Sequence, residues 1–172
     1  MSQEQYPIGQ FQCPSTITPQ QITAWIEQMK ALPQQLETLT ASLSDKELSY
    51  RYRKNGWTIR QLVHHIADSH MNSYIRFKLA LTEDEPTIKP YAEDQWAKLA
   101  DSALPIAVSL ACLDALHTRW AALLESLTAD QLSRCFIHPD TGKIPLQQCI
   151  GLYAWHGAHH VAHIEQALQY KI

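Results

Sequence analysis

The sequence predicts an all-α protein, a four-helix bundle with a long crossover between the second and third helices. Four long segments repeat apolar residues at helical spacing, and no series of alternating strand segments accompanies them. A proline-containing segment, residues 84–104, separates the second helical segment from the third and is too long for a tight turn. These features are typical of an antiparallel helical bundle with one long connection.

The first helix begins after Thr18, an N-cap residue followed by Pro19 and, three residues after the cap, by Gln21. Pro33 has no backbone N–H and is expected to kink or interrupt this helix, which should end near Ser44. Residues 1–17 should be extended along the surface, and residues 45–56 should form a charged loop. The predicted inward face consists of Ile22, Trp25, Ile26, Met29, Leu36, Leu39 and Leu43.

The second helix begins after Thr58, which forms a capping box with Gln61, and is expected to reach about Glu83. Three histidines lie on it: His64, His65 and His70. Its predicted inward face consists of Ile59, Leu62, Val63, Ile66, Ser73, Phe77 and Ala80.

The crossover that follows should contain one helical turn near residues 95–100. A third helix is predicted over residues 105–127, a short capped turn at 128–131 and a small hairpin over 136–144. The last helix should span about 145–170, with a weak start because Ile144 is a poor N-cap. The inward face of the third helix consists of Ile106, Leu110, Leu113, Leu116, Trp120, Leu123 and Leu124.

The composition is that of an ordinary globular chain. Its 172 residues fit a single domain over 1–172, with 45% hydrophobic and 18% charged residues and a net charge of -3. There is no basic block and no apolar run of about 18 residues, so we expect neither nucleic-acid nor membrane partners. The start has no visible export signal, which predicts a cytoplasmic protein. The four cysteines are widely separated, which argues against a disulfide framework or a zinc ribbon.

The last helix holds four of the nine histidines: His156, His159, His160 and His163. Its apolar arc contains Ile150, Tyr153, Val161, Ile164 and Leu168, and a helical wheel places His156 and His160 closest to it. Residues four apart on a helix have Cβ atoms about 6 Å apart, which lets two imidazoles bind one metal ion. A third ligand should come from the second helix, where the spacing leaves His64, His65 and His70 as alternatives.

Two motifs carry a family resemblance: WTIRQLVHHIADSHMNSYIR at 57–76 and WHGAHH at 155–160. Together with residues 6–9 and 86–91, they resemble the YfiT-type metal-dependent hydrolases of the DinB-like superfamily over nearly the whole chain. The resemblance implies that His65 joins His156 and His160 around one zinc or nickel ion per subunit, in a cytoplasmic homodimer. One departure is Ala158, where the family pattern has arginine.

Three neutral imidazoles leave a divalent ion its full charge, which lowers the pKa of a bound water to about 7 and favours hydrolysis of a small-molecule substrate. No catalytic residue can be assigned from the sequence. The nearest acids are Asp68 and Glu165, which could instead orient a histidine or lie on the surface, and Asn72 could bind substrate.

Two other functions fit the same residues. The metal could present a low-molecular-weight thiol to an electrophile, as in the thiol S-transferases of this superfamily. Alternatively, the chain could be a non-catalytic metal-binding bundle, which predicts a closed site with a fourth protein ligand, His159 or His64. The sequence does not identify the substrate or the metal.

Overall fold

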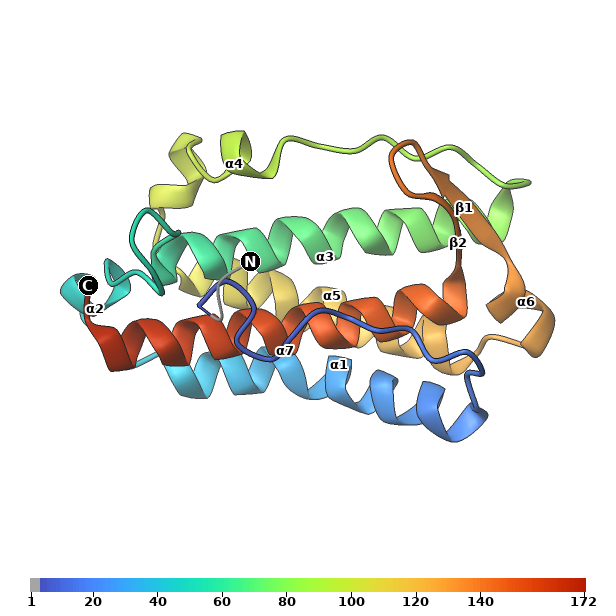
Figure 1. Ribbon diagram of the computed structural model, residues 1–172, viewed down its shortest axis with the longest axis horizontal. Helices are drawn as coiled ribbons and strands as arrows, with labels where there is room; N and C mark the ends of the chain where they lie inside the picture. Colours follow the sequence, from blue (N-terminus) through green and yellow to red (C-terminus); the bar gives the residue numbers. More distant parts are fainter. Residues whose placement is uncertain (1–3) are drawn as a thin grey trace.

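The computed structural model describes residues 4–172, and its architecture is a four-helix bundle with a small hairpin (Figure 1). The long helices are α1 (Pro19–Thr40), α3 (Ile59–Thr82), α5 (Ala107–Glu125) and α7 (Leu146–Tyr170). Helices α1 and α3 each pack against both α5 and α7, so α1 lies diagonally across the bundle from α3. The prediction of a four-helix bundle with a long crossover is confirmed.

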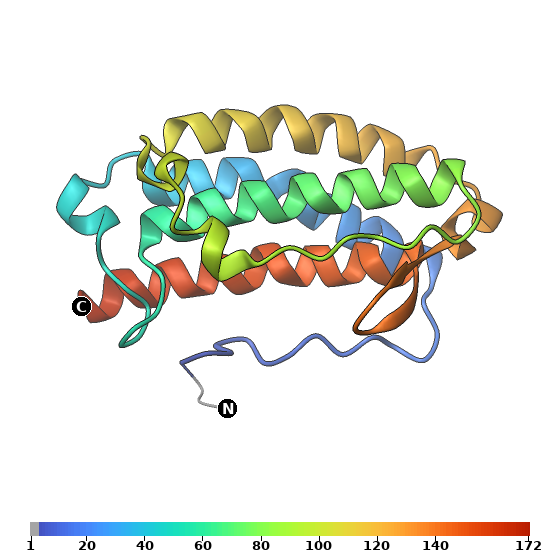
Figure 2. The ribbon, with the colours of Figure 1, turned by 90° about the horizontal axis from the view of Figure 1, so that it is seen from above.

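The direction of the helices differs from the predicted antiparallel arrangement. Helices α3 and α5 run in the same direction, and α1 and α7 both run in the opposite one (Figures 1 and 2). The reason is the crossover, which carries the chain back along the outside of α3 before α5 begins. It contains two short helices, α4 (Glu93–Trp96) and η1 (Ala100–Ala103), which overlap the two ends of the helical turn predicted near residues 95–100.

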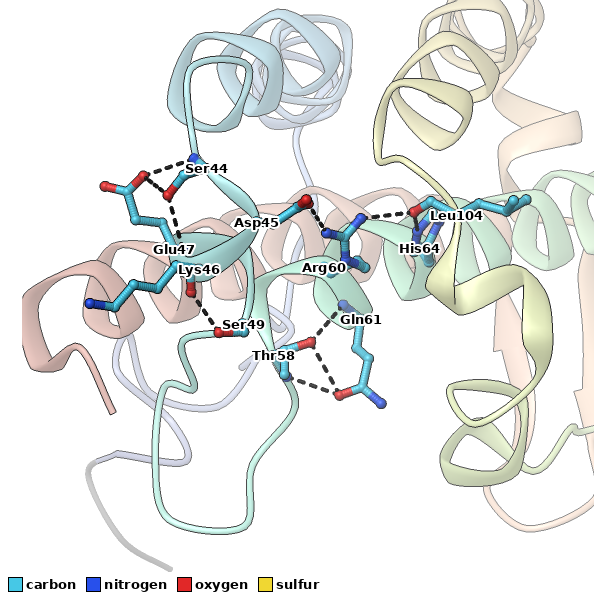
Figure 3. Close-up of polar contacts among 10 residues, drawn as sticks. All are labelled: Ser44, Asp45, Lys46, Glu47, Ser49, Thr58, Arg60, Gln61, His64 and Leu104. Atoms are coloured by element: carbon cyan, nitrogen blue, oxygen red, sulfur yellow. Dashed lines mark hydrogen bonds and ion pairs between the residues drawn. The ribbon is translucent and has the colours of Figure 1, made fainter.

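Side-chain caps set the helix starts. The predicted capping box of α3 is present, because Gln61 N–H donates to Thr58 Oγ1 at 3.2 Å and the Gln61 side chain accepts from the Thr58 N–H. A second capping box, between Ser44 and Glu47, starts the short helix α2 (Asp45–Leu48), as Figure 3 shows. The predicted loop over 45–56 is therefore wrong at its first turn, and α1 ends at Thr40 rather than near Ser44.

Helix α1 continues through Pro33, contrary to the predicted interruption. Proline has no N–H, so the carbonyl four residues earlier, that of Met29, lacks its usual helical partner. In the structure that carbonyl accepts a hydrogen bond from His117 Nδ1 at 2.6 Å. This tertiary bond offsets part of the cost of proline inside the helix.

The predicted hairpin is confirmed as the antiparallel pair β1 (Cys135–His138) and β2 (Gly142–Pro145), which follows the short helix α6 (Ala129–Ser133). Strand β1 also anchors the start of the crossover, because the Ile88 N–H donates to the Ile137 carbonyl and the Ile137 N–H donates to the Pro86 carbonyl, both at 2.9 Å. Helix α7 has no side-chain cap, as expected from the weak start signal.

The N-terminal segment lies along α7 without helix or strand structure, which agrees with the predicted extended course from residue 4 onward (Figure 1). Residues 1–3 of that prediction lie outside the described residues. Trp155 Nε1 donates to the Gly9 carbonyl at 3.2 Å, and Gln166 Nε2 donates to the Glu4 carbonyl at 3.1 Å. These bonds hold the segment against the face of α7 that carries the histidines.

The hydrophobic core consists of two clusters, one toward each end of the bundle. Buried histidines interrupt it on three helices: His70 lies between Ala67 and Phe77, and His117 lies between Leu113 and Trp120. On α7, the buried His160 and the half-buried His156 occupy the same interval between Ala154 and Val161. The predicted inward face of α3 is buried in full. A layer of imidazoles therefore crosses a mainly apolar interior.

Within residues 4–172, no helix combines the length and apolar character that crossing a membrane requires.

Candidate metal centre

The structure brings together His65 from α3 with His156 and His160 from α7. Each offers a ring nitrogen, and these three atoms all lie within 4.8 Å of one another. The ring centroids of His156 and His160, one helical turn apart, are 4.5 Å apart, and that of His65 is 5.4 Å and 4.9 Å from them. Trp57 packs against the outer side of the His65 ring with centroids 4.5 Å apart.

The donor set fits a divalent transition-metal ion. Within the described residues, no hydrogen bond reaches the ring nitrogens of His65, although the residue is only 5% exposed. Three converging imidazoles are a common catalytic zinc ligand set, with bonds of about 2.0–2.1 Å.

All three histidines are held in the neutral form that binds metal. Burial lowers the pKa of His65 to about 4, although the charge of Asp94 opposes this shift. Burial also lowers the pKa of His156 and of His160 well below the usual value, and the neighbouring histidines add to the effect. His156 as a residue is half-buried, and its ring packs against the rings of His65, His160 and Tyr153. The site is therefore uncharged at neutral pH without metal.

A second group of three histidines overlaps the first. Nitrogens of His159, His160 and His163, all buried, also lie within 4.8 Å of one another, so His160 belongs to both groups. His159 stacks on Trp155 with ring centroids 4.6 Å apart, and its Nδ1 is buried without a hydrogen-bond partner among the described residues.

The other two histidines of α3 have different partners. His64 Nε2 is 3.0 Å from the Leu104 carbonyl (Figure 3), and His64 Nδ1 is 2.7 Å from Ser109 Oγ. Both nitrogens therefore have partners outside the triad of His65, His156 and His160. His70 is fully buried, with Nε2 3.1 Å from His156 Nδ1 and Nδ1 2.9 Å from His117 Nε2. Of the three alternatives on this helix, only His65 joins the two histidines of α7 in one group.

His117, on α5, was not predicted from the sequence. Its spacing, four residues after Leu113 and three before Trp120, puts it on the inward face of that helix, which is the signal that could have revealed it.

An open pocket of about 740 Å³ adjoins the triad, because His160 belongs to the triad and also lines the pocket. Part of its wall comes from the crossover and includes Glu93 and Asp94. Partial loss of hydration around the Glu93 carboxyl, followed by the charge of Asp94, raises its pKa, although the residue as a whole is exposed. The remaining lining residues are Gln5, Tyr6, Tyr52, Arg53, Asn55, Gly56, Trp57, Tyr91, Ala92, Gln95, His159 and His163.

The acids and the amide named from the sequence lie elsewhere. Asp68 does not line this pocket; burial and then Asp101 raise its pKa. Glu165 is exposed in a separate shallow groove between α1 and α7. Asn72 donates to the Asp68 carbonyl within its own helix at 2.8 Å. Glu93 and Asp94 were missed because no sequence periodicity places a long crossover over a site on other helices.

Comparison with known proteins identifies the family. A model of the DinB superfamily matches residues 28–164. The chain belongs to the DinB superfamily. A protein of Halalkalibacterium halodurans, named a putative metal-dependent hydrolase, is 55% identical over 163 residues that cover 95% of each chain. The solved structure of YfiT from Bacillus subtilis, described as a probable metal-dependent hydrolase with an unusual four-helix bundle topology, superposes with a TM-score of 0.95 at 46% identity over 98% of each chain.

A more distant likeness concerns the fold alone. A mycothiol-dependent maleylpyruvate isomerase matches 83% of this DinB-superfamily chain and 60% of its own, with a TM-score of 0.65 and 15% identity.

The metal-free protein is expected to lose stability as the pH falls from about 6.5 toward about 4. His65, His159 and His163 each have a folded-state pKa of about 4 against an ordinary value of 6.5, so the unfolded chain binds more protons in this window. Each such histidine contributes a slope of about 1.4 kcal/mol per pH unit. Urea unfolding at several pH values measures this slope, and a flat profile between pH 6.5 and pH 4 would contradict the assigned burial.

Proposed function

We propose that the protein is a metal-dependent hydrolase that binds one divalent ion, zinc or nickel, through His65, His156 and His160. The observation that carries the proposal is the convergence of three neutral imidazole nitrogens, within 4.8 Å of one another, beside an open pocket. Imidazole suits zinc and nickel alike, so the ligand set favours both over calcium or magnesium. The names of the similar proteins from Halalkalibacterium halodurans and Bacillus subtilis agree with this activity.

When bound, the ion would supply Lewis acidity, which makes water available as a nucleophile near neutral pH and polarises the bond under attack. The protein supplies the proton transfer. Glu93 faces the same pocket, and its raised pKa lets its carboxylate take a proton from the attacking water and return it to the leaving group. Asp94, beside it, favours that protonated state electrostatically.

The substrate should be a small molecule, because the pocket volume of about 740 Å³ matches ligands of that size. The aromatic rings of Tyr6, Tyr52, Trp57 and Tyr91 give the pocket apolar surface, while Arg53 and Glu93 contribute opposite charges. These residues orient a substrate that carries both apolar and polar groups.

Turnover tests the proposal. Protein purified without chelators and loaded with zinc or nickel is assayed against small esters, amides and phosphoesters in water labelled with heavy oxygen. Label in the product, lost in Glu93→Gln and in His65→Ala, supports hydrolysis. Turnover that requires an added thiol and gives a thioether product would instead establish a thiol S-transferase. Metal binding without any turnover would favour a non-catalytic bundle.

We also propose that the protein is a cytoplasmic homodimer. Met71 and Ile75, one helical turn apart on α3, are exposed apolar side chains (42% and 50%), and a second copy of the chain could cover them. All four cysteines are free, as expected in a reducing compartment. Sedimentation should give twice the chain mass of 19.6 kDa. A single-chain mass would refute the dimer.

A further inference from the structure

A chain of hydrogen bonds runs from the triad through the core to the backbone of α1. His117 Nδ1 lies 2.6 Å from the Met29 carbonyl, His117 Nε2 lies 2.9 Å from His70 Nδ1, and His70 Nε2 lies 3.1 Å from His156 Nδ1. The carbonyl only accepts, so His117 Nδ1 carries the proton and His117 Nε2 is a lone-pair acceptor. His70 Nδ1 must therefore donate to His117 Nε2, which leaves His70 Nε2 as an acceptor. His156 Nδ1 in turn donates to His70 Nε2. His156 Nε2 is left as a bare lone pair.

A second and shorter chain ends on the N-terminal segment. His163 Nε2 lies 3.2 Å from the Gln5 carbonyl, so this nitrogen carries the proton and His163 Nδ1 accepts. His160 Nδ1, 3.3 Å from His163 Nδ1, must then be the donor. His160 Nε2 is left bare, as His156 Nε2 is.

We propose that His70, His117 and His163 are positioning residues that hold His156 and His160 in the Nδ1–H tautomer, with both Nε2 lone pairs ready to bind metal. The inference rests on the proposed metal site and not on the reaction performed there. Metal-binding histidines commonly donate their second N–H to a fixed acceptor, which sets both tautomer and ring orientation. Here the fixed acceptors are two backbone carbonyls, reached through other histidines.

This assignment explains three features. Pro33 leaves the Met29 carbonyl without its helical partner. This carbonyl is therefore free to accept from His117 and to anchor the hydrogen-bond chain that ends at His156. The N-terminal segment lies along α7, where the Gln5 carbonyl anchors the shorter hydrogen-bond chain, through His163 to His160. The second histidine group does not form an equivalent metal site, because His160 Nδ1 holds a proton that His163 accepts.

The first test reads the tautomers directly. Full-length, metal-free protein labelled with nitrogen-15 at histidine is studied by long-range proton–nitrogen NMR near neutral pH. We expect protonated Nδ1 and bare Nε2 at both His156 and His160. An Nε2–H tautomer at either residue would overturn the proposal, and this holds whether or not the protein proves to be a hydrolase.

The second test measures zinc affinity in His70→Leu and His163→Leu, each of which removes an acceptor but no ligand. We expect affinity to fall by about 10- to 100-fold, with a mixture of tautomers appearing at His156 or His160 respectively. The matched control is His64→Leu. His64 is a buried histidine on α3, as His70 is, but its partners are Ser109 and Leu104. This substitution should leave both readouts unchanged.

The two tests separate the possible failures. Folded His70→Leu and His163→Leu proteins that bind zinc as tightly as the wild type would refute the positioning role. If either variant does not fold, the wild-type NMR result alone decides. If the wild type has the expected tautomers but binds no zinc, the proposed function fails while the hydrogen-bond assignment stands.

Discussion

His65→Ala is expected to weaken zinc binding by about 100- to 1000-fold. Structural zinc sites with four protein ligands have a binding free energy of about 10–16 kcal/mol, so one ligand accounts for about 2.5–4 kcal/mol. His65 is the one member of the triad that comes from α3, so its loss leaves only the two ligands of α7. A competition titration with a chromophoric chelator measures the dissociation constant.

The control for this prediction is His64→Ala, one residue away on the same helix and also buried. Its ring bonds Ser109 and Leu104 rather than the triad, so zinc affinity should stay near that of the wild type. Equal losses in the two variants would mean that folding, and not ligation, is affected. Unchanged affinity in His65→Ala would exclude His65 as a ligand.

Trp120→Ala is expected to lower the free energy of unfolding by about 3–5 kcal/mol, the range typical of removing a large buried aromatic side chain. Trp120 is 0% exposed, and its ring makes edge contacts with His70, Phe77 and Tyr153. The cavity would open beside the histidine layer, where the surrounding rings cannot collapse without breaking hydrogen bonds. Urea unfolding of metal-free protein, followed by circular dichroism, measures the change.

The matched control is Trp96→Ala in the crossover, where the side chain is 37% exposed and its described ring contact is with Tyr91. Its expected loss is less than half that of Trp120→Ala, because it fills no enclosed space. A loss below about 1 kcal/mol in Trp120→Ala would show that the bundle repacks around this position and would contradict the fixed core.

Local signals account for the parts of the fold that the sequence predicted. Apolar spacing located the four long helices, and the Thr58 capping box fixed the start of α3 to the residue. The parallel course of α3 and α5 could not be predicted, because it depends on the route of the crossover over α3. The uninterrupted α1 was missed for a related reason: the partner of the Met29 carbonyl is His117, far away in sequence.

The residues of the candidate site also fall into those that local sequence signals predict and those that they do not. His156 and His160 emerged from the geometry of a single helix, whereas His65 could be chosen over His64 and His70 only through family resemblance. Glu93, His117 and the Gln5 carbonyl reach the site from the crossover, α5 and the N-terminal segment. Their roles depend on contacts between distant segments, which periodicity within one helix does not encode.

The location of the metal tests the central claim most directly. Crystals of the full chain grown with zinc would be measured at the zinc absorption edge, where anomalous scattering locates the ion without assumptions about its ligands. One site per chain, about 2.0–2.1 Å from the Nε2 atoms of His156 and His160 and from one ring nitrogen of His65, is the predicted result. An ion held by His159, His160 and His163, or zinc bound only at the surface, would contradict it.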